Sequence, residues 1–190
     1  MRLVLASASP RRLDLLKRIG VVPDAVIPAE IDEIPKKGDL PVHHAVRMAA
    51  EKAAAVHARE VDALILAADT VVAVGRRILP KTAHEGEARR ALTLLSGRRH
   101  RVHSAVTLID AKGVARHRLS TSIVTFKRLS DAELDAYIAT GEWQGKAGGY
   151  AIQGHAEALV RALAGSHSGV VGLPLYETRA LLRAAGYNLG

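Results

Sequence analysis

Two adjacent arginines follow a predicted helix start in residues 7–12, which read SASPRR. Ser9 before Pro10 is typical of a helix N-terminus, where unpaired backbone N–H groups attract phosphate. Arg11 and Arg12 add permanently charged guanidinium groups that can each hold two oxygens. The simpler alternative is an ordinary helix start whose arginines lie in water. By itself, the segment leaves a phosphate-binding site and a plain helix cap both open.

A carboxylate, Asp69, follows the apolar run ALILAA of residues 63–68. Burying a carboxylate is costly unless it is paired, hydrogen-bonded or bound to a metal. We expect Asp69 and Thr70 to interrupt a buried strand, so that Asp69 lies at a strand end beside a cleft. There it could act as a general base or as a Mg²⁺ ligand. The alternative is a structural aspartate that caps a turn.

Three further acidic residues, Glu30, Asp32 and Glu33, form a cluster in a chain that is otherwise basic. Oxygen ligands of this kind suit a hard divalent cation. The cluster could equally offset the charges of Lys36 and Lys37. The cluster alone does not decide between these two hypotheses.

The lysines and histidines of the sequence give weaker indications of a functional site. Lys52 lies at the flank of a predicted helix face, between core and solvent, and Lys81 follows Pro80, so ordinary surface positions are the default for both. The nine histidines form no HExxH motif, and we expect them, including the adjacent pair His43 and His44, on the surface or in loops. The chain also lacks a P-loop and a GxSxG motif, which argues against hydrolysis through a covalent serine.

The composition favours a small anionic ligand. The formal net charge is +8, which favours anionic partners, whereas aromatic residues make up only 3% of the chain. This scarcity argues against a base-stacking surface for nucleic acid. No cysteine is present, which excludes disulfides and thiolate catalysis. No apolar run approaches the roughly 20 residues that span a bilayer, and we expect a cytoplasmic protein without a membrane segment.

Hydrophobic periodicity predicts an α/β protein with a mixed sheet flanked by helices, in one domain over residues 1–190. Strands are predicted at residues 2–6, 24–29, 63–68, 71–74, 77–79, 101–110, 114–129 and 158–163. Helices are predicted at residues 10–20, 42–59, 85–97, 131–140 and 175–186. A capping box of Ser130 and Glu133 opens the fourth of these helices. Residues 146–154 and 165–174 are expected to be loops.

Several short motifs occur in a fixed order along the chain. They are ASASPRR, EIDE, AEKA, ILAADTVV, a PK step, LLSGRRHRV, KAGGYAIQG and GVVGLP. Together, from Leu3 to about Leu182, they resemble the Maf family of nucleoside triphosphate pyrophosphatases. The resemblance implies two lobes on a twisted mixed sheet with a deep central cleft, the Maf/ITPase-like fold. It also implies hydrolysis between the α and β phosphates, which gives a nucleoside monophosphate and pyrophosphate and needs Mg²⁺, Mn²⁺ or Co²⁺.

The resemblance also implies roles for individual residues. Asp69 would accept a proton and, with Glu33, bind the metal, while Lys52 and Lys81 would neutralise phosphate charge during catalysis. The residues implied for substrate binding are Ser7, Arg11 and Arg12 at the triphosphate, Thr70, and Gln153 at the base. Attack of water on a phosphoryl centre needs charge neutralisation and positioning more than covalent chemistry, and this residue set can supply both.

The doublet of Arg11 and Arg12 and the motif AIQG resemble the subgroup that prefers dTTP and UTP. The 7-methyl-GTP subgroup tends to carry tryptophan at the first arginine position and an acidic residue in place of Gln153. A glutamine amide has both a donor and an acceptor, so it can recognise a pyrimidine edge. The resemblance therefore implies dTTP, UTP and modified pyrimidine nucleotides as substrates, and a homodimer.

Two alternative functions stay open. One is a non-catalytic regulator of cell division that binds nucleotides or nucleic acid on the same scaffold, and the other is a pyrophosphatase for another noncanonical nucleotide. The chain also departs from the family pattern at two sites. Pro80, Lys81 and Thr82 stand where Gly-Lys-Pro is common, and SHSGVVGLP lacks the usual aromatic residue and asparagine. We expect the backbone at Lys81 to be set differently and the second loop to close less rigidly.

Overall fold

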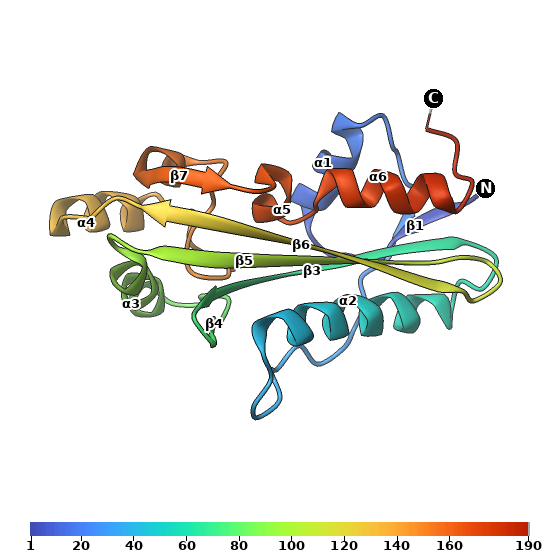
Figure 1. Ribbon diagram of the computed structural model, residues 1–190, viewed down its shortest axis with the longest axis horizontal. Helices are drawn as coiled ribbons and strands as arrows, with labels where there is room; N and C mark the ends of the chain where they lie inside the picture. The colour runs from blue at the N-terminus through green and yellow to red at the C-terminus, as the bar shows by residue number, and fades with distance from the viewer. Residues whose placement is uncertain (190) are drawn as a thin grey trace.

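The computed structural model describes residues 1–189, and its strands form one mixed sheet of seven strands (Figure 1). The order is β2, β1, β3, β5, β6, β7, with β4 beside β3. The bounds are Leu3–Leu5 (β1), Ala25–Val26 (β2), Leu64–Val74 (β3), Arg77–Leu79 (β4), Arg99–Ile109 (β5), Ala115–Phe126 (β6) and Val160–Ala164 (β7). β1 runs parallel to β2 and β3, whereas the other pairings are antiparallel. The predicted α/β class is confirmed.

Helices cover both faces of this sheet. The α-helices are Pro10–Arg18 (α1), Pro41–His57 (α2), Glu85–Leu95 (α3), Asp131–Ala139 (α4), His167–Val171 (α5) and Leu175–Ala184 (α6), and a 3₁₀ helix, η1, spans His155–Leu159. Figure 1 shows α2 along one side of the sheet and α1 and α6 along the other. On the α2 side, Ala45 and Ala49 pack against Val71 and Ala105. Within residues 1–189, no helix combines the length and apolarity needed to cross a bilayer.

β3 passes straight through Asp69 and Thr70. The strand contains 11 residues, and Asp69 pairs in register with Ala105 of β5. The prediction that Asp69 and Thr70 interrupt the strand was therefore wrong. The ladder continues because β5 supplies backbone partners from Ile65 to Ala73, so a polar side chain in the middle does not break the pairing. Asp69 consequently projects from a rigid strand interior and not from a loop.

The C-terminal region differs from the prediction in its details. The expected loop at residues 165–174 contains α5, which begins because the Ser166 hydroxyl accepts a hydrogen bond from the Gly169 N–H at 2.9 Å. The strand predicted at residues 158–163 begins only at Val160, after η1. Near the other end of the chain, β2 is limited to Ala25–Val26, far shorter than predicted.

Candidate active site

A cavity of about 400 Å³ lies between the start of α1, the middle of β3, residues 145–153 and α5. A smaller neighbouring cavity shares Ser9, Arg12 and Lys81 with it. Every site residue predicted from the sequence lines one of the two: Arg11, Arg12, Asp69, Thr70, Lys81 and Gln153 the first, and Ser7, Glu33 and Lys52 the second. Chain segments that are distant in sequence thus meet at one place.

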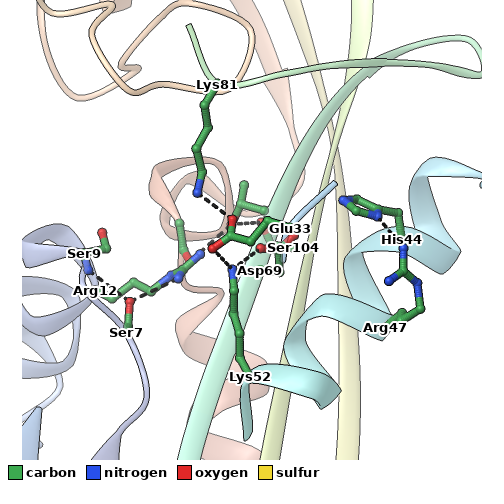
Figure 2. Close-up of polar contacts among 12 residues, drawn as sticks. Ser7, Ser9, Arg12, Glu33, His44, Arg47, Lys52, Asp69, Lys81 and Ser104 are labelled. Atoms are coloured by element: carbon green, nitrogen blue, oxygen red, sulfur yellow. Dashed lines mark hydrogen bonds and ion pairs between the residues drawn. The ribbon is translucent and has the colours of Figure 1, made fainter. Parts of the chain in front are cut away.

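Lys52 joins two of the predicted carboxylates, as Figure 2 shows. Its Nζ lies 2.7 Å from Oδ1 of Asp69 and 3.0 Å from Oε1 of Glu33. Lys81 approaches Glu33 from the opposite side, with its Nζ 2.7 Å from Oε2. A continuous chain of alternating charges therefore crosses the two cavities, in the order Lys81, Glu33, Lys52 and Asp69.

Lys52 is buried, with only 5% of its surface exposed. The alternative of an ordinary surface lysine does not hold for Lys52, because α2 lies directly against β3 and turns this position toward Asp69. Asp69 is buried to a similar degree, at 6% exposure. Two opposite charges at this depth compensate each other's loss of water, which removing either one would undo.

Glu33 is held in its ionised form. Its burial alone would raise the pKa, but the hydrogen bond from Lys81 and the charge and hydrogen bond of Lys52 outweigh this effect and lower the pKa to about 2. Glu30 and Asp32, the other members of the acidic cluster, are exposed and line neither cavity. The acidic cluster therefore contributes a single residue to the site.

Arg12 is fixed in the cleft by neutral oxygens. Its Nε donates to the backbone carbonyl of Gly172 at 2.9 Å, and a terminal nitrogen donates to the Ser7 hydroxyl at 3.1 Å. Ser7 also accepts the Ser9 N–H at 3.1 Å, so it orders the backbone at the start of α1. Ser9 itself occupies the N-cap position without forming a side-chain capping bond. Burial lowers the pKa of Arg12, and the charge of Asp69 opposes this shift.

The sequence reasoning missed Ser104, which connects β5 to α5. Its hydroxyl donates to the Gly169 carbonyl at 2.5 Å and lies 3.2 Å from the Thr70 hydroxyl. Thr70 in turn donates to the Gly172 carbonyl at 3.3 Å. The sequence could have indicated this residue, because a serine inside a predicted buried strand has a hydroxyl that requires a hydrogen-bond partner. These bonds attach α5 to the sheet at the edge of the cavity.

The segment that carries Lys81 is attached to residues 143–148. Thr82 donates its N–H to the Lys146 carbonyl at 3.2 Å and its hydroxyl to the Trp143 carbonyl at 2.6 Å. Lys81 also forms an isolated β-bridge with Ala147. Thr82 is buried, and its N–H bond is one that proline could not form.

Histidines are not all at the surface, contrary to expectation. His44, His100 and His103 are buried. His100 Nε2 lies 2.7 Å from the hydroxyl of Tyr150, which lines the cavity. Desolvation lowers the pKa of His100 to about 4. Within residues 1–189, no three acidic, histidine or cysteine side chains gather in a way that could hold a metal ion.

The fold and the site define an α/β protein whose cleft combines cationic side chains with two carboxylates that are paired with lysine. The chain belongs to the Maf family, because the family model described as Maf-like protein matches residues 2–185.

Curated relatives cover almost the whole chain. The dTTP/UTP pyrophosphatase of Novosphingobium aromaticivorans is 63% identical over 98% of this chain and 93% of its own length. The dTTP/UTP pyrophosphatase of Sphingopyxis alaskensis is 61% identical over 99% of this chain and 98% of its own length. Among solved structures, a HAM1 protein from Coxiella burnetii aligns with a TM-score of 0.53 and 16% identity, over 97% of this chain and all of that one. At this identity, the last likeness concerns the fold alone.

Proposed function

We propose that this protein hydrolyses dTTP and UTP between the α and β phosphates, which gives the nucleoside monophosphate and pyrophosphate. The observation that carries the proposal is the buried pair of Asp69 and Lys52, held beside Arg12 in a cationic cleft. The names of relatives at 61% and 63% identity support the same reaction and the same bases.

Asp69 is the proposed proton acceptor. In this role Asp69, which contacts Lys52 through Oδ1 and lines the cavity, orients a water molecule and takes its proton as the water attacks the α phosphorus. Lys52 keeps the carboxylate in place on a strand that cannot readily shift. Positioning and charge neutralisation then supply most of the rate acceleration, because phosphoryl transfer to water requires no covalent intermediate.

The triphosphate is assigned to the cations and hydroxyl at the mouth of the cleft. Arg11 and Arg12 present guanidinium groups, and Ser7 holds both the Arg12 side chain and the backbone N–H of Ser9, just before α1. Lys81 is 60% exposed at its side chain, so it can leave Glu33 and reach a phosphate oxygen. The charges of Arg11, Arg12 and Lys81 neutralise negative charge that the phosphates carry.

Glu33 and Asp69 are the proposed protein ligands of a divalent cation. Mg²⁺ is commonly held by one or two carboxylates together with substrate phosphates and water, and two carboxylates beside a proposed phosphate site fit this pattern. Such a cation would neutralise charge on the phosphoryl oxygens. Lys52, which contacts both carboxylates, keeps them close to each other in this protein.

Thr70 and Gln153 are the proposed substrate contacts outside the triphosphate. Gln153 is exposed within the cavity lining, so its amide can meet a pyrimidine edge with one donor and one acceptor. Thr70 lies next to the proton acceptor on β3. A homodimer, a cytoplasmic location and a single domain over residues 1–190 complete the proposal.

The test is a panel of nucleoside triphosphates with Mg²⁺, in which pyrophosphate and orthophosphate are measured separately. We expect pyrophosphate from dTTP and UTP at rates well above those for 7-methyl-GTP, and a loss of about 10³-fold in kcat for Asp69→Asn. Circular dichroism checks that this variant is folded. Faster cleavage of the purine would overturn the base assignment. Nucleotide binding without turnover would favour a regulator on the same scaffold.

A further inference from the structure

Two cations in the cleft are not matched by any carboxylate. Arg11 and Lys146 both line the 400 Å³ cavity, and among residues 1–189 neither forms an ion pair. Arg11 Nε is buried without a hydrogen-bond partner in the described chain. Lys146 Nζ donates to the carbonyl of Gln144 at 3.0 Å. The other lysines of the site, Lys52 and Lys81, are both paired with carboxylates.

The two unmatched cations line the same cavity, where their like charges repel each other. Burial lowers the pKa of Lys146, and the charge of Arg11 lowers it further. Glu142 is the one acidic residue that opposes this shift, and its carboxylate is already engaged by His155 at 2.6 Å. A fold that keeps two uncompensated cations together in a cavity gains stability when an anion binds between them.

We propose that Lys146 and Arg11 together form the subsite for the departing pyrophosphate. This inference rests on the proposed function and deepens it, because neither the sequence motifs nor the resemblance assigned a role to Lys146. The pyrophosphate carries more negative charge than the α phosphate that stays on the nucleoside, so it requires the cations that the fold itself leaves unneutralised.

Asp69 and Lys146 both line the 400 Å³ cavity, so the attacking water and the departing pyrophosphate can be held in one cleft. In the reaction, a water oxygen bonds to the α phosphorus and the bond to the bridging oxygen breaks. That oxygen leaves with the pyrophosphate, opposite the attacking water, and Asp69 takes the proton.

Backbone contacts hold Lys146 in place before substrate arrives. Its carbonyl accepts the Thr82 N–H, and the neighbouring Gly145 N–H donates to the Thr82 carbonyl at 2.8 Å. The Gly148 N–H donates to the Pro80 carbonyl at 3.3 Å. The lysine thus projects from a braced turn, which lowers the entropy cost of binding a phosphate.

The test is calorimetric binding of inorganic pyrophosphate and of UMP, with MgCl₂, to the wild type, Lys146→Gln, Lys146→Arg and Lys112→Gln. Lys112 is exposed on the β5–β6 turn, outside both cavities, and its variant removes the same charge. We expect Lys146→Gln to weaken pyrophosphate binding about ten- to hundredfold and UMP binding by less than about threefold. We expect Lys146→Arg to restore most of the pyrophosphate affinity and Lys112→Gln to leave it unchanged.

Three results would overturn the subsite. They are an unchanged pyrophosphate affinity in Lys146→Gln, an equal loss for UMP, or an equal loss in Lys112→Gln. Because pyrophosphate binding requires no turnover, the result is independent of the nucleotide panel. A wild type that binds pyrophosphate through Lys146 but cleaves no triphosphate would contradict the proposed function and leave the subsite standing.

Discussion

At the scale of single residues, the decisive feature is an ammonium group buried between two carboxylates. Lys52 contacts Asp69 at 2.7 Å and Glu33 at 3.0 Å. A buried ion pair adds little net stability compared with an apolar pair, but removing one partner leaves the other charged and desolvated. The position of two carboxylates in the site therefore depends on one lysine.

Replacing Lys52 tests how much the stability of the protein depends on this lysine. We expect Lys52→Met to lower the free energy of unfolding by about 3 kcal/mol, near the lower end for a broken buried pair because Glu33 is partly open to water. Urea unfolding at pH 7 measures the change. The double variant Lys52→Met/Asp69→Asn should recover part of the loss, since it also removes the stranded charge. A midpoint equal to that of the wild type in Lys52→Met would contradict this view.

At the scale of elements, α5 and β3 act together through one glycine. The Gly172 carbonyl accepts hydrogen bonds from both Arg12 and Thr70. Gly172 ends α5 with φ at 144°, a conformation that other residues rarely adopt. This backbone shape points one carbonyl at a cation from α1 and at a hydroxyl from the sheet. The short helix consequently helps to position the phosphate-binding arginine.

Substituting this glycine should affect substrate binding. We expect Gly172→Ala to cost roughly 1–2 kcal/mol of stability and to raise KM several-fold, because the strained backbone shifts the carbonyl that holds Arg12. Steady-state kinetics with UTP and thermal unfolding measure the two effects. Gly186→Ala is the matched control, since Gly186 also has positive φ, at 77°, but lies at the end of α6 outside the cleft. Equal KM changes in the two variants would refute a positioning role for Gly172.

At the scale of the whole molecule, a buried cluster attaches the cavity wall to the sheet. His100 of β5, Phe126 of β6 and Tyr150 of the cavity wall meet edge to face, with ring centroids 4.9–5.5 Å apart. His100 and Tyr150 also share a 2.7 Å hydrogen bond. Aromatic contacts of this geometry add to simple burial. The cluster favours the neutral form of the His100 imidazole, because burial removes the water that would stabilise a charged ring.

This requirement predicts a pH dependence of stability. The unfolded chain binds a proton at His100 near pH 6.5, whereas the folded protein binds it only near pH 4. Between these values the unfolded state carries more protons, so we expect the free energy of unfolding to fall as pH decreases, by up to about 1.4 kcal/mol per pH unit from this group. Above pH 6.5 its contribution is complete. Urea unfolding from pH 7.5 to pH 4 measures the slope, and His100→Gln should flatten it. A slope that is the same in the variant would assign the effect to other groups.

Secondary structure could be predicted from sequence where local signals are strong. The capping box at Ser130 is present in α4, and Pro10 begins α1 as expected. The errors occur where long-range pairing outweighs local chemistry. Asp69 remains inside β3 because β5 supplies a backbone partner there, and α5 forms in a glycine-containing stretch because Ser166 caps it and Ser104 binds it from the sheet. The β5 partner of Asp69 and Ser104, which binds α5, are both distant in sequence from the residues that they hold, whereas the Ser166 cap is local.

The sequence by itself determined the class of fold, the family motifs and the identity of the candidate site residues, since these depend on residue type, periodicity and order. Only the tertiary structure decided which lysines are paired and which cations stay unmatched. The helix pattern alone left Lys52 at the flank between core and solvent, and it is buried between carboxylates. Lys146 stood in a motif without an assigned role, and within residues 1–189 it forms no ion pair, although it lines the same cavity as Arg11. The reason is that charge neutralisation depends on distance in space, and contacts across the sheet and its loops set that distance.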